Sequence, residues 1–194
     1  MIIFIRHGED MKKDHSHDEV LVESAKNKIE EFTQRLIEET GIPDIIYCSP
    51  FYRTRQTAKY MKRTIRKLYG QEVIIKIEKK LGRYFSLSEQ NNPDLHNTTL
   101  KQDPIIYESQ ADFKKRIYKL HKYLSKKYTN EGRNEGRNEG RNEGRNEGRN
   151  EGSRDNEQNI WNITHSLVMV RTIKHYSLNR SKYIQYLDKI IIPL

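Results

Sequence analysis

MIIFIRHG, residues 1–8, is a short apolar run that leads directly into an arginine, a histidine and a glycine. A short continuous apolar run is typical of a strand that is buried on both faces of a parallel sheet. We therefore expect residues 1–5 to form such a strand, followed by a polar loop to about Asp18. Because ligands of open α/β sheets bind beyond the carboxyl ends of the strands, a histidine at this place indicates function. The adjacent glycine allows the backbone to approach a ligand closely.

Strand and helix patterns alternate along the rest of the chain. Apolar residues at helical spacing predict a helix from about Val20 to Thr40, ended by Gly41 and Pro43. Further strands are expected at 44–48, 72–77, 160–164 and 190–192, and further helices at 53–69, 109–127 and 168–176. Residues 78–107 show no clear period and are expected to form a long loop with short elements. The alternation predicts an α/β fold over residues 1–194, a single-domain three-layer sandwich with a mostly parallel central sheet flanked by helices.

A low-complexity repeat interrupts this domain. The unit Asn-Glu-Gly-Arg occurs five times from Asn130 to Arg149, and residues 150–152 begin a sixth copy. A repeat with almost no apolar residues cannot build a core, and a glycine in every unit opposes a helix. We expect a disordered, charge-balanced loop at about 129–158. An arginine- and glycine-rich tether for nucleic acid is the alternative, which the paired glutamates disfavour.

The composition limits the classes of partner and compartment. Of 194 residues, 36 are Lys or Arg and 27 are Asp or Glu, which gives a net charge of +9. This excess favours anionic partners such as phosphorylated molecules or nucleic acid, although a solvated lysine-rich surface gives the same number. The single cysteine, Cys48, excludes an intramolecular disulfide framework. Since no apolar run approaches the roughly 20 residues of a membrane-spanning helix, we expect a cytoplasmic protein that does not bind membranes.

Two later segments place residues suited to phosphate chemistry at strand ends. SPFYRTRQTA, residues 49–58, follows the strand expected at 44–48 and leads into a helix, whose N-terminus attracts anions. Arg53 or Arg55 in this segment can clamp a phosphoryl group with its fork of donors. His165 follows the strand expected at 160–164 and can stabilise charge on transferring oxygens. Each residue taken alone also fits a simpler interpretation, a solvated helix arginine or a core histidine.

Taken together, the three segments resemble the histidine phosphatase superfamily, also called the phosphoglycerate-mutase-like family. That family shows a strand ending in Arg-His-Gly, then Ser-Pro-x-x-Arg-x-x-Gln-Thr-Ala, then a strand ending in a second histidine. The corresponding residues here are 4–9, 49–58 and 164–165. The resemblance implies that His7 is the nucleophile and becomes phosphorylated. It also implies three phosphate-binding residues around the phosphoryl group: Arg6, Arg53 and His165.

The resemblance further implies a proton donor, and it implies no metal and no other cofactor. The family's acid usually lies four residues before a glycine, which assigns the role to Glu78, four residues before Gly82. The chain also departs from the family pattern. Ser166 follows the second histidine where glycine is usual, the Gly-x-x-Glu-Gly element after the acid is absent, and Asp10 stands where some phosphatase branches carry an arginine. These departures concern substrate contacts more than the core chemistry.

The function expected from this resemblance is a metal-independent phosphatase that acts on phosphomonoesters through a covalent phosphohistidine at His7. Its partner would be a small phosphorylated substrate or a phosphoprotein. The residues after Gly82 lack the long insertion of a glycolytic mutase, which favours a phosphatase over a mutase. The alternatives are a phosphomutase and a non-catalytic domain that binds phosphorylated ligands or nucleic acid.

Overall fold

The structure is a computed structural model that describes residues 1–11, 20–86, 107–128, 158–178 and 184–192. The Asn-Glu-Gly-Arg repeat and most of the expected loop at 78–107 lie outside these residues. The described elements, in chain order, are β1 (Ile2–Arg6), α1 (Ala25–Thr40), β2 (Ile45–Cys48), α2 (Tyr52–Tyr69), β3 (Ile74–Ile77), the 3-10 helix η1 (Lys79–Leu81), β4 (Phe85–Ser86), β5 (Tyr107–Glu108), α4 (Gln110–Tyr128), β6 (Ile160–Thr164), α5 (Ser166–His175) and β7 (Lys189–Ile192).

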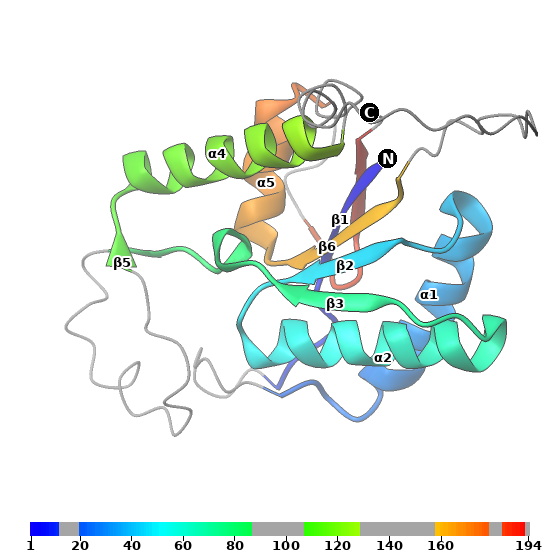
Figure 1. The fold of residues 1–194 in the computed structure, drawn as a ribbon. Helices are drawn as coiled ribbons and strands as arrows, with labels where there is room; N and C mark the ends of the chain where they lie inside the picture. The colour runs from blue at the N-terminus through cyan, green and yellow to red at the C-terminus, as the bar shows by residue number, and fades with distance from the viewer. Residues whose placement is uncertain (12–19, 87–106, 129–157, 179–183, 193–194) are drawn as a thin grey trace, which may run out of the picture.

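A five-stranded sheet in the order β3-β2-β6-β1-β7 forms the centre of the protein (Figure 1). β1, β2, β3 and β6 all run parallel to one another. β7, at the edge, pairs with β1 in the antiparallel direction. The mostly parallel α/β sheet predicted from the sequence is therefore confirmed. β4 and β5 form a separate two-stranded pair.

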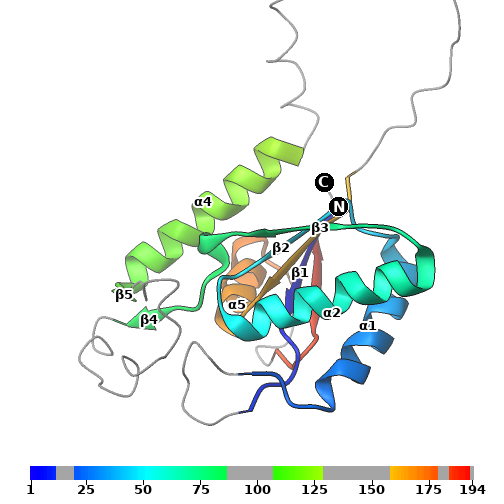
Figure 2. The same cartoon turned by 60° about the horizontal axis from the view of Figure 1, so that its bottom comes forward.

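Helices cover both faces of the sheet, as the turned view shows (Figure 2). Because side chains of a strand alternate between its two faces, β1 contributes to two cores. Ile3 and Ile5 pack with residues of α1 and α2, whereas Ile2 and Phe4 pack with residues of α4 and α5. All four side chains are buried, which explains why residues 2–5 of this strand are all apolar.

The first helix begins later than the sequence predicts. α1 starts at Ala25 and not near Val20, because residues 20–22 pair with the loop after β1. The N–H of Met11 donates to the carbonyl of Val20 at 2.9 Å, and the N–H of Val22 donates to the carbonyl of Glu9 at 3.0 Å. These bonds use backbone groups that a helix would otherwise need. The prediction for residues 20–24 was wrong, and the remaining helices and strands lie within a few residues of their predicted bounds.

The described residues that flank the repeat segment, Tyr128 and Gln158, are each in contact with the central sheet or the residue just before it. The hydroxyl of Tyr128, the last residue of α4, is 2.6 Å from the hydroxyl of Tyr47 in β2. Where the described chain resumes, the carbonyl of Gln158 accepts from the amine of Met1 at 2.6 Å, and the N–H of Asn159 donates to Asp44 at 2.7 Å. Both attachment points are thus tied to the sheet directly.

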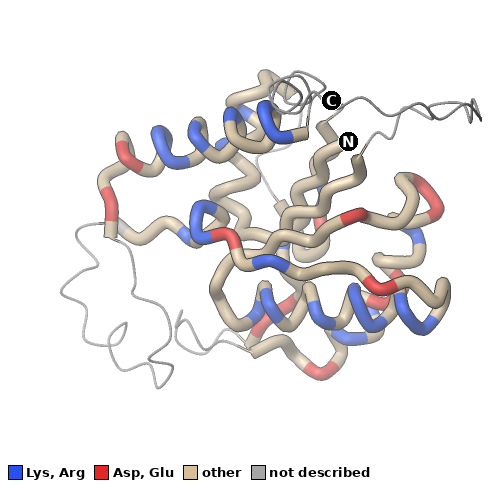
Figure 3. The backbone as a smooth tube through the Cα atoms, in the orientation of Figure 1, with Lys and Arg blue, Asp and Glu red and all other residues tan. Residues whose placement is uncertain are grey.

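Positive charge is spread over both faces of the protein. Lys and Arg occur along α2 on one face and along α4 on the other (Figure 3). This distribution agrees with the solvated-surface interpretation of the net charge, since no single described helix carries it alone. In the described part of the chain, no helix is both long enough and apolar enough to cross a membrane.

Candidate active site

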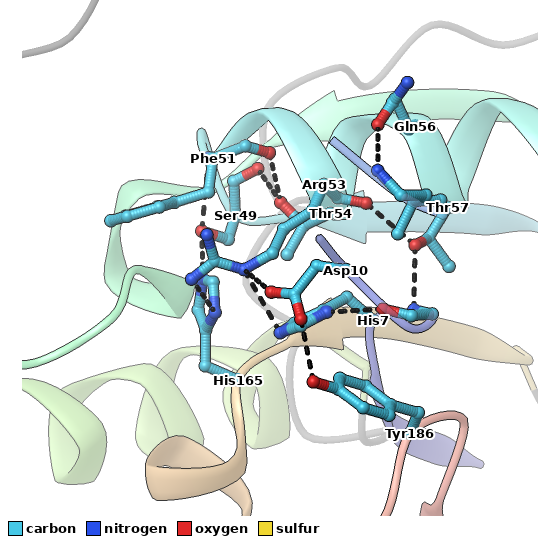
Figure 4. A network of polar contacts seen from close by, with 12 residues as sticks. His7, Asp10, Ser49, Phe51, Arg53, Thr54, Gln56, Thr57, His165 and Tyr186 are labelled. Atoms are coloured by element: carbon cyan, nitrogen blue, oxygen red, sulfur yellow. Dashed lines mark hydrogen bonds and ion pairs between the residues drawn. The ribbon is translucent and has the colours of Figure 1, made fainter. Parts of the chain in front are cut away.

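Three neighbouring strands bring the predicted residues together at the carboxyl edge of the sheet (Figure 4). His7 follows β1, Arg53 lies in the first turn of α2 after β2, and His165 follows β6. Sheet-like backbone bonds continue past the strand ends: His7 donates to the carbonyl of Thr164 at 3.1 Å, and Ser49 donates to that of Ile163 at 3.0 Å. The ring centroids of His7 and His165 are consequently only 5.3 Å apart.

The guanidinium of Arg53 bridges the two imidazoles. Its Nε donates to Nε2 of His7 at 3.2 Å, and its Nη2 lies 3.4 Å from Nδ1 of His165. The other ring nitrogen of His7, Nδ1, is 2.8 Å from the carbonyl of Gly8. Because a carbonyl can only accept, Nδ1 carries the proton and Nε2 presents its lone pair. His7 is therefore held in the tautomer that a nucleophilic Nε2 requires.

Burial and positive charge keep both histidines neutral. His7 and His165 are each 4% exposed. Burial, reinforced by the charge of Arg53, lowers the pKa of His7 to about 3. The same causes, burial first and Arg53 second, hold the pKa of His165 well below its ordinary value. A neutral imidazole retains a lone pair and can act as a nucleophile.

Ser49 and Phe51 orient His165. Nε2 of His165 lies 3.0 Å from Oγ of Ser49, and since Nδ1 faces the donor Arg53, Nε2 is the nitrogen that donates in the neutral ring. The ring of Phe51 meets His165 edge-on at a centroid distance of 4.8 Å. Both residues belong to the SPFYRTRQTA segment, yet the sequence alone gave no role to either.

Thr57 and Gln56, near the end of the same segment, accept hydrogen bonds from backbone N–H groups on either side of the loop after His7. The hydroxyl of Thr57 accepts from the N–H of Gly8 at 3.1 Å, and the side-chain carbonyl of Gln56 accepts from the N–H of Leu21 at 3.0 Å. The first bond fixes the backbone next to His7, and the second fixes the strand-like segment that pairs with residues 9–11. These motif residues hold the loop that carries His7.

Gly8 is required by close packing. A Cβ at this position would lie 2.9 Å from Cδ1 and 3.2 Å from Cγ1 of Ile29, a fully buried residue of α1. The absence of a side chain thus lets α1 pack directly against the loop after β1.

Asp10 and Tyr186 belong to the site although sequence reasoning missed them. Oδ2 of Asp10 is 3.3 Å from Nε of Arg53, and the hydroxyl of Tyr186 donates to Oδ1 of Asp10 at 2.7 Å (Figure 4). Burial and this bond to Asp10 raise the pKa of Tyr186 to about 12. In the sequence, Asp10 stands out only because it departs from the family pattern. Tyr186 lies far away in the sequence and within no motif.

Arg6 lies beside the site, where its guanidinium contacts the ring of Tyr186. Its Nη1 donates to the carbonyl of Ile184, and its guanidinium carbon lies 4.1 Å from the centroid of the Tyr186 ring. The Nε of Arg6 is buried and has no hydrogen-bond partner among the described residues. The charge of Arg6 contributes to the lowered pKa of His7. A cavity of about 520 Å³ adjoins the guanidinium and is lined by Arg6, Glu9, Lys28, Ile184, Gln185, Tyr186 and Leu187.

Glu78 lies at the same edge of the sheet but in a separate cluster of contacts. It follows β3, the edge strand, and its Oε1 accepts from the N–H of Lys80 at 2.9 Å, so that it caps η1. Arg116 of α4 fixes this turn by donating to the carbonyls of Lys80 and Gly82, at 2.6 and 3.1 Å. The hydrogen bonds described for the Glu78 side chain do not reach His7, Arg53 or His165.

Metal ligands do not gather in the described part of the chain, where no three His, Cys, Asp or Glu side chains form a group that could hold an ion. The polar loop around His15 and His17 lies outside the described residues.

A sequence profile of the histidine phosphatase superfamily (branch 1) matches residues 2–132. Since this match covers most of the chain, the protein belongs to the histidine phosphatase superfamily. The match ends before His165, so it is the structure that brings the second histidine beside the first. No curated protein matches the chain by sequence.

Solved structures share the fold at low sequence identity. Mycobacterial hydrolase 1 has a TM-score of 0.55 and 15% identity, over 91% of this chain and 81% of that one. A mycobacterial glucosyl-3-phosphoglycerate phosphatase has a TM-score of 0.52 and 16% identity, over 91% and 79%. The protein histidine phosphatase SixA, complexed with tungstate, has a TM-score of 0.50 and 14% identity, over 89% and 74%. These similarities establish the α/β fold of the chain.

Proposed function

We propose that the chain is a metal-independent phosphatase that hydrolyses phosphomonoesters through a covalent phosphohistidine at His7. The observation that carries this proposal is the tautomer of His7, whose Nε2 lone pair faces Arg53 next to His165. A neutral imidazole with a fixed lone pair beside a guanidinium combines a nucleophile with a donor for the phosphoryl oxygens.

The reaction has two steps. Nε2 of His7 attacks phosphorus, the bond from phosphorus to the ester oxygen breaks, and a proton passes from the carboxyl of Glu78 to the leaving oxygen. Water then attacks the phosphohistidine, its proton returns to Glu78, and the bond between Nε2 and phosphorus breaks to release phosphate. Arg6 and Arg53 bind the phosphoryl oxygens in both steps. His165 binds them through Nδ1 after its neutral ring changes to the tautomer that carries the proton there, with Nε2 then accepting from the hydroxyl of Ser49.

The substrate class follows from the same site. A small phosphorylated molecule or a phosphorylated protein side chain presents the phosphoryl group that the site would bind. The cavity beside Arg6, with Glu9 and Lys28 among its lining residues, offers space for the rest of such a substrate. Release of phosphate to water, and not to an acceptor alcohol, distinguishes this proposal from a phosphomutase.

The test is hydrolysis of a generic aryl phosphate at mildly acidic pH by the full chain and by His7→Ala. We expect His7→Ala to abolish turnover, and His175→Ala, which changes an exposed histidine of α5, to retain it. Rapid quenching with a radiolabelled substrate should trap acid-labile, base-stable label on His7, as a phosphohistidine requires. Label on any other residue would refute the mechanism.

A further inference from the structure

Asp10 brings a negative charge into the space where the proposed function places a phosphoryl group. Its carboxylate lies 3.3 Å from Nε of Arg53, and the two side chains are 8% and 3% exposed. The same Nε donates to Nε2 of His7, the proposed nucleophilic atom. A phosphoryl group on His7 must therefore share Arg53 with a buried carboxylate.

Contacts on two sides hold the Asp10 carboxylate in this place. The hydroxyl of Tyr186 donates to it at 2.7 Å, and the Tyr186 ring itself lies 5.7 Å from the ring of His7. The backbone of Asp10 pairs with Leu21 as an isolated antiparallel bridge. Rotation of the carboxylate out of the pocket would break its contacts with both Arg53 and Tyr186.

The charges around Asp10 do not suit a doubly charged anion. Among the described residues that contact one another here, Arg6 and Arg53 supply two positive charges and Asp10 supplies one negative charge. The partly exposed Arg83, whose guanidinium lies over the ring of Phe85, acts on His165 from outside this group. His7 and His165 stay neutral because burial and Arg53 lower the pKa of each, and Tyr186 stays neutral because its pKa is raised to about 12. A bound dianion would leave the buried site with excess negative charge, which is costly in a medium of low dielectric constant. One added proton removes this excess.

We infer that Asp10 takes up a proton when a phosphoryl group binds, and that the resulting carboxyl donates a hydrogen bond to a non-bridging phosphoryl oxygen. The proton comes from solvent and returns to it when phosphate leaves, so that the overall hydrolysis is unchanged. Glu78 keeps its proposed role at the leaving oxygen. Asp10 would then make the site specific for tetrahedral oxyanions that bind together with a proton. It would also make the affinity for such anions higher at acidic pH. This inference rests on the proposed function for its ligand class alone.

Sulfate is the probe for the test, because it is a dianion from mildly acidic to mildly alkaline pH and brings no proton of its own. Binding to the full chain is measured by calorimetry in buffers of different ionisation enthalpy, which counts the protons taken up. We expect the wild type to take up close to one proton per sulfate and its Kd to rise about tenfold per pH unit where Asp10 is ionised. Asp10→Asn should take up no proton at this position, and should bind sulfate at least about tenfold more tightly in alkaline buffer because a like charge is gone.

Three further variants identify the group that takes up the proton. His7→Asn and His165→Asn each remove one of the two imidazoles in contact with Arg53, and Tyr186→Phe removes the hydroxyl but keeps the carboxylate. All three should retain the uptake, and its loss in His7→Asn would contradict the inference. If Asp10→Asn does not fold, Asp10→Ser serves in its place. Undiminished uptake in the Asp10 variant, loss of uptake in His165→Asn, or a failure of wild type and Asp10 variant alike to bind sulfate overturns the inference. Turnover that survives His7→Ala would refute the phosphatase mechanism and leave the sulfate result standing, so the two failures are distinguishable.

Discussion

Arg53 and His7 are joined by a hydrogen bond of 3.2 Å from Nε to Nε2, between side chains that are both almost wholly buried. The bond directs the lone pair of His7 toward a cation, and that cation also reduces the proton affinity of the ring. Arg53 thus orients the proposed nucleophile and, together with the larger effect of burial, keeps it unprotonated.

Replacing Arg53 should change the titration of His7 as well as activity. In Arg53→Met the pKa of His7 should rise, because a nearby positive charge is removed, yet it should stay below its ordinary value because burial is the larger cause. We expect kcat/KM for an aryl phosphate to fall by about two orders of magnitude or more, since a charge-stabilising donor is lost. NMR titration of the imidazole signals measures the first effect and steady-state kinetics the second.

Arg55→Met is the matched control for this prediction. Arg55 lies two residues further along α2 and is partly exposed, with its guanidinium 6.0 Å from the ring of Tyr52. It should leave both the titration and the activity close to those of the wild type. An equal loss in the two variants would show that Arg53 acts through helix stability and not through the site.

A methyl group at Gly8 should push the loop of His7 away from α1. Gly8→Ala places a Cβ 2.9 Å from Cδ1 of Ile29, and overpacking of a buried contact costs about 1–3 kcal/mol of unfolding free energy. Chemical denaturation measures that loss. Because Ile29→Val removes the clashing Cδ1, the double variant should lose less than the sum of the two single losses. Strict additivity would contradict the contact.

Substrates with different leaving groups distinguish a role of Glu78 as proton donor from a role as the cap of η1. If Glu78 protonates the leaving oxygen, Glu78→Gln should lower kcat by about a hundredfold or more for an alkyl phosphate, and by much less for a nitrophenyl phosphate, whose leaving group needs no proton. Glu72→Gln, which changes an exposed carboxylate just before β3, is the control and should leave both rates unchanged. Equal losses on the two substrates in Glu78→Gln would assign Glu78 to the cap of η1 alone.

Buried neutral histidines should make the fold sensitive to acid. Burial, with a smaller contribution from His175, lowers the pKa of His121 to about 4. The unfolded chain therefore binds the proton first as the pH falls, and stability is lost between the ordinary pKa of histidine and the folded value, at about 1.4 kcal/mol per pH unit per histidine. Replacement by an uncharged residue, His121→Gln, should flatten the dependence of unfolding free energy on pH in this window.

His175→Gln is the comparison for this prediction, because it changes the exposed ring that stacks on His121 at 4.9 Å and leaves the buried one in place. The His175→Gln variant should retain most of the dependence of unfolding free energy on pH. An unchanged slope in His121→Gln would mean that this histidine does not titrate differently in the folded protein.

The sequence predicted those parts of the protein that depend on local patterns. The apolar run of β1 and the helical spacing of α1, α2 and α4 reflect burial against the sheet, so each carried its own signal. The start of α1 could not be read in this way, because residues 20–22 pair with residues 9–11 across a loop. Tertiary pairing replaced a local preference there.

The site was predictable only where a motif marked it. His7, Arg53 and His165 each follow a strand, and parallel strands bring such residues to one edge. Tyr186 carries no motif, and its contact with Asp10 spans 176 positions of the chain. Such a partner becomes visible only when β7 is placed beside β1.

The attachment of the repeat segment has a consequence for how this gene can change. The segment leaves α4 at Tyr128, whose hydroxyl contacts Tyr47 of β2, and rejoins at Gln158, whose carbonyl contacts Met1 just before β1. Neither of these two contacts involves His7, Arg53 or His165. Each Asn-Glu-Gly-Arg unit is a whole number of codons, so that gain or loss of copies during replication keeps the reading frame and alters neither the site nor its supports. Natural variants of this protein are therefore expected to differ in the number of copies, while His7, Arg53 and His165 keep the same arrangement.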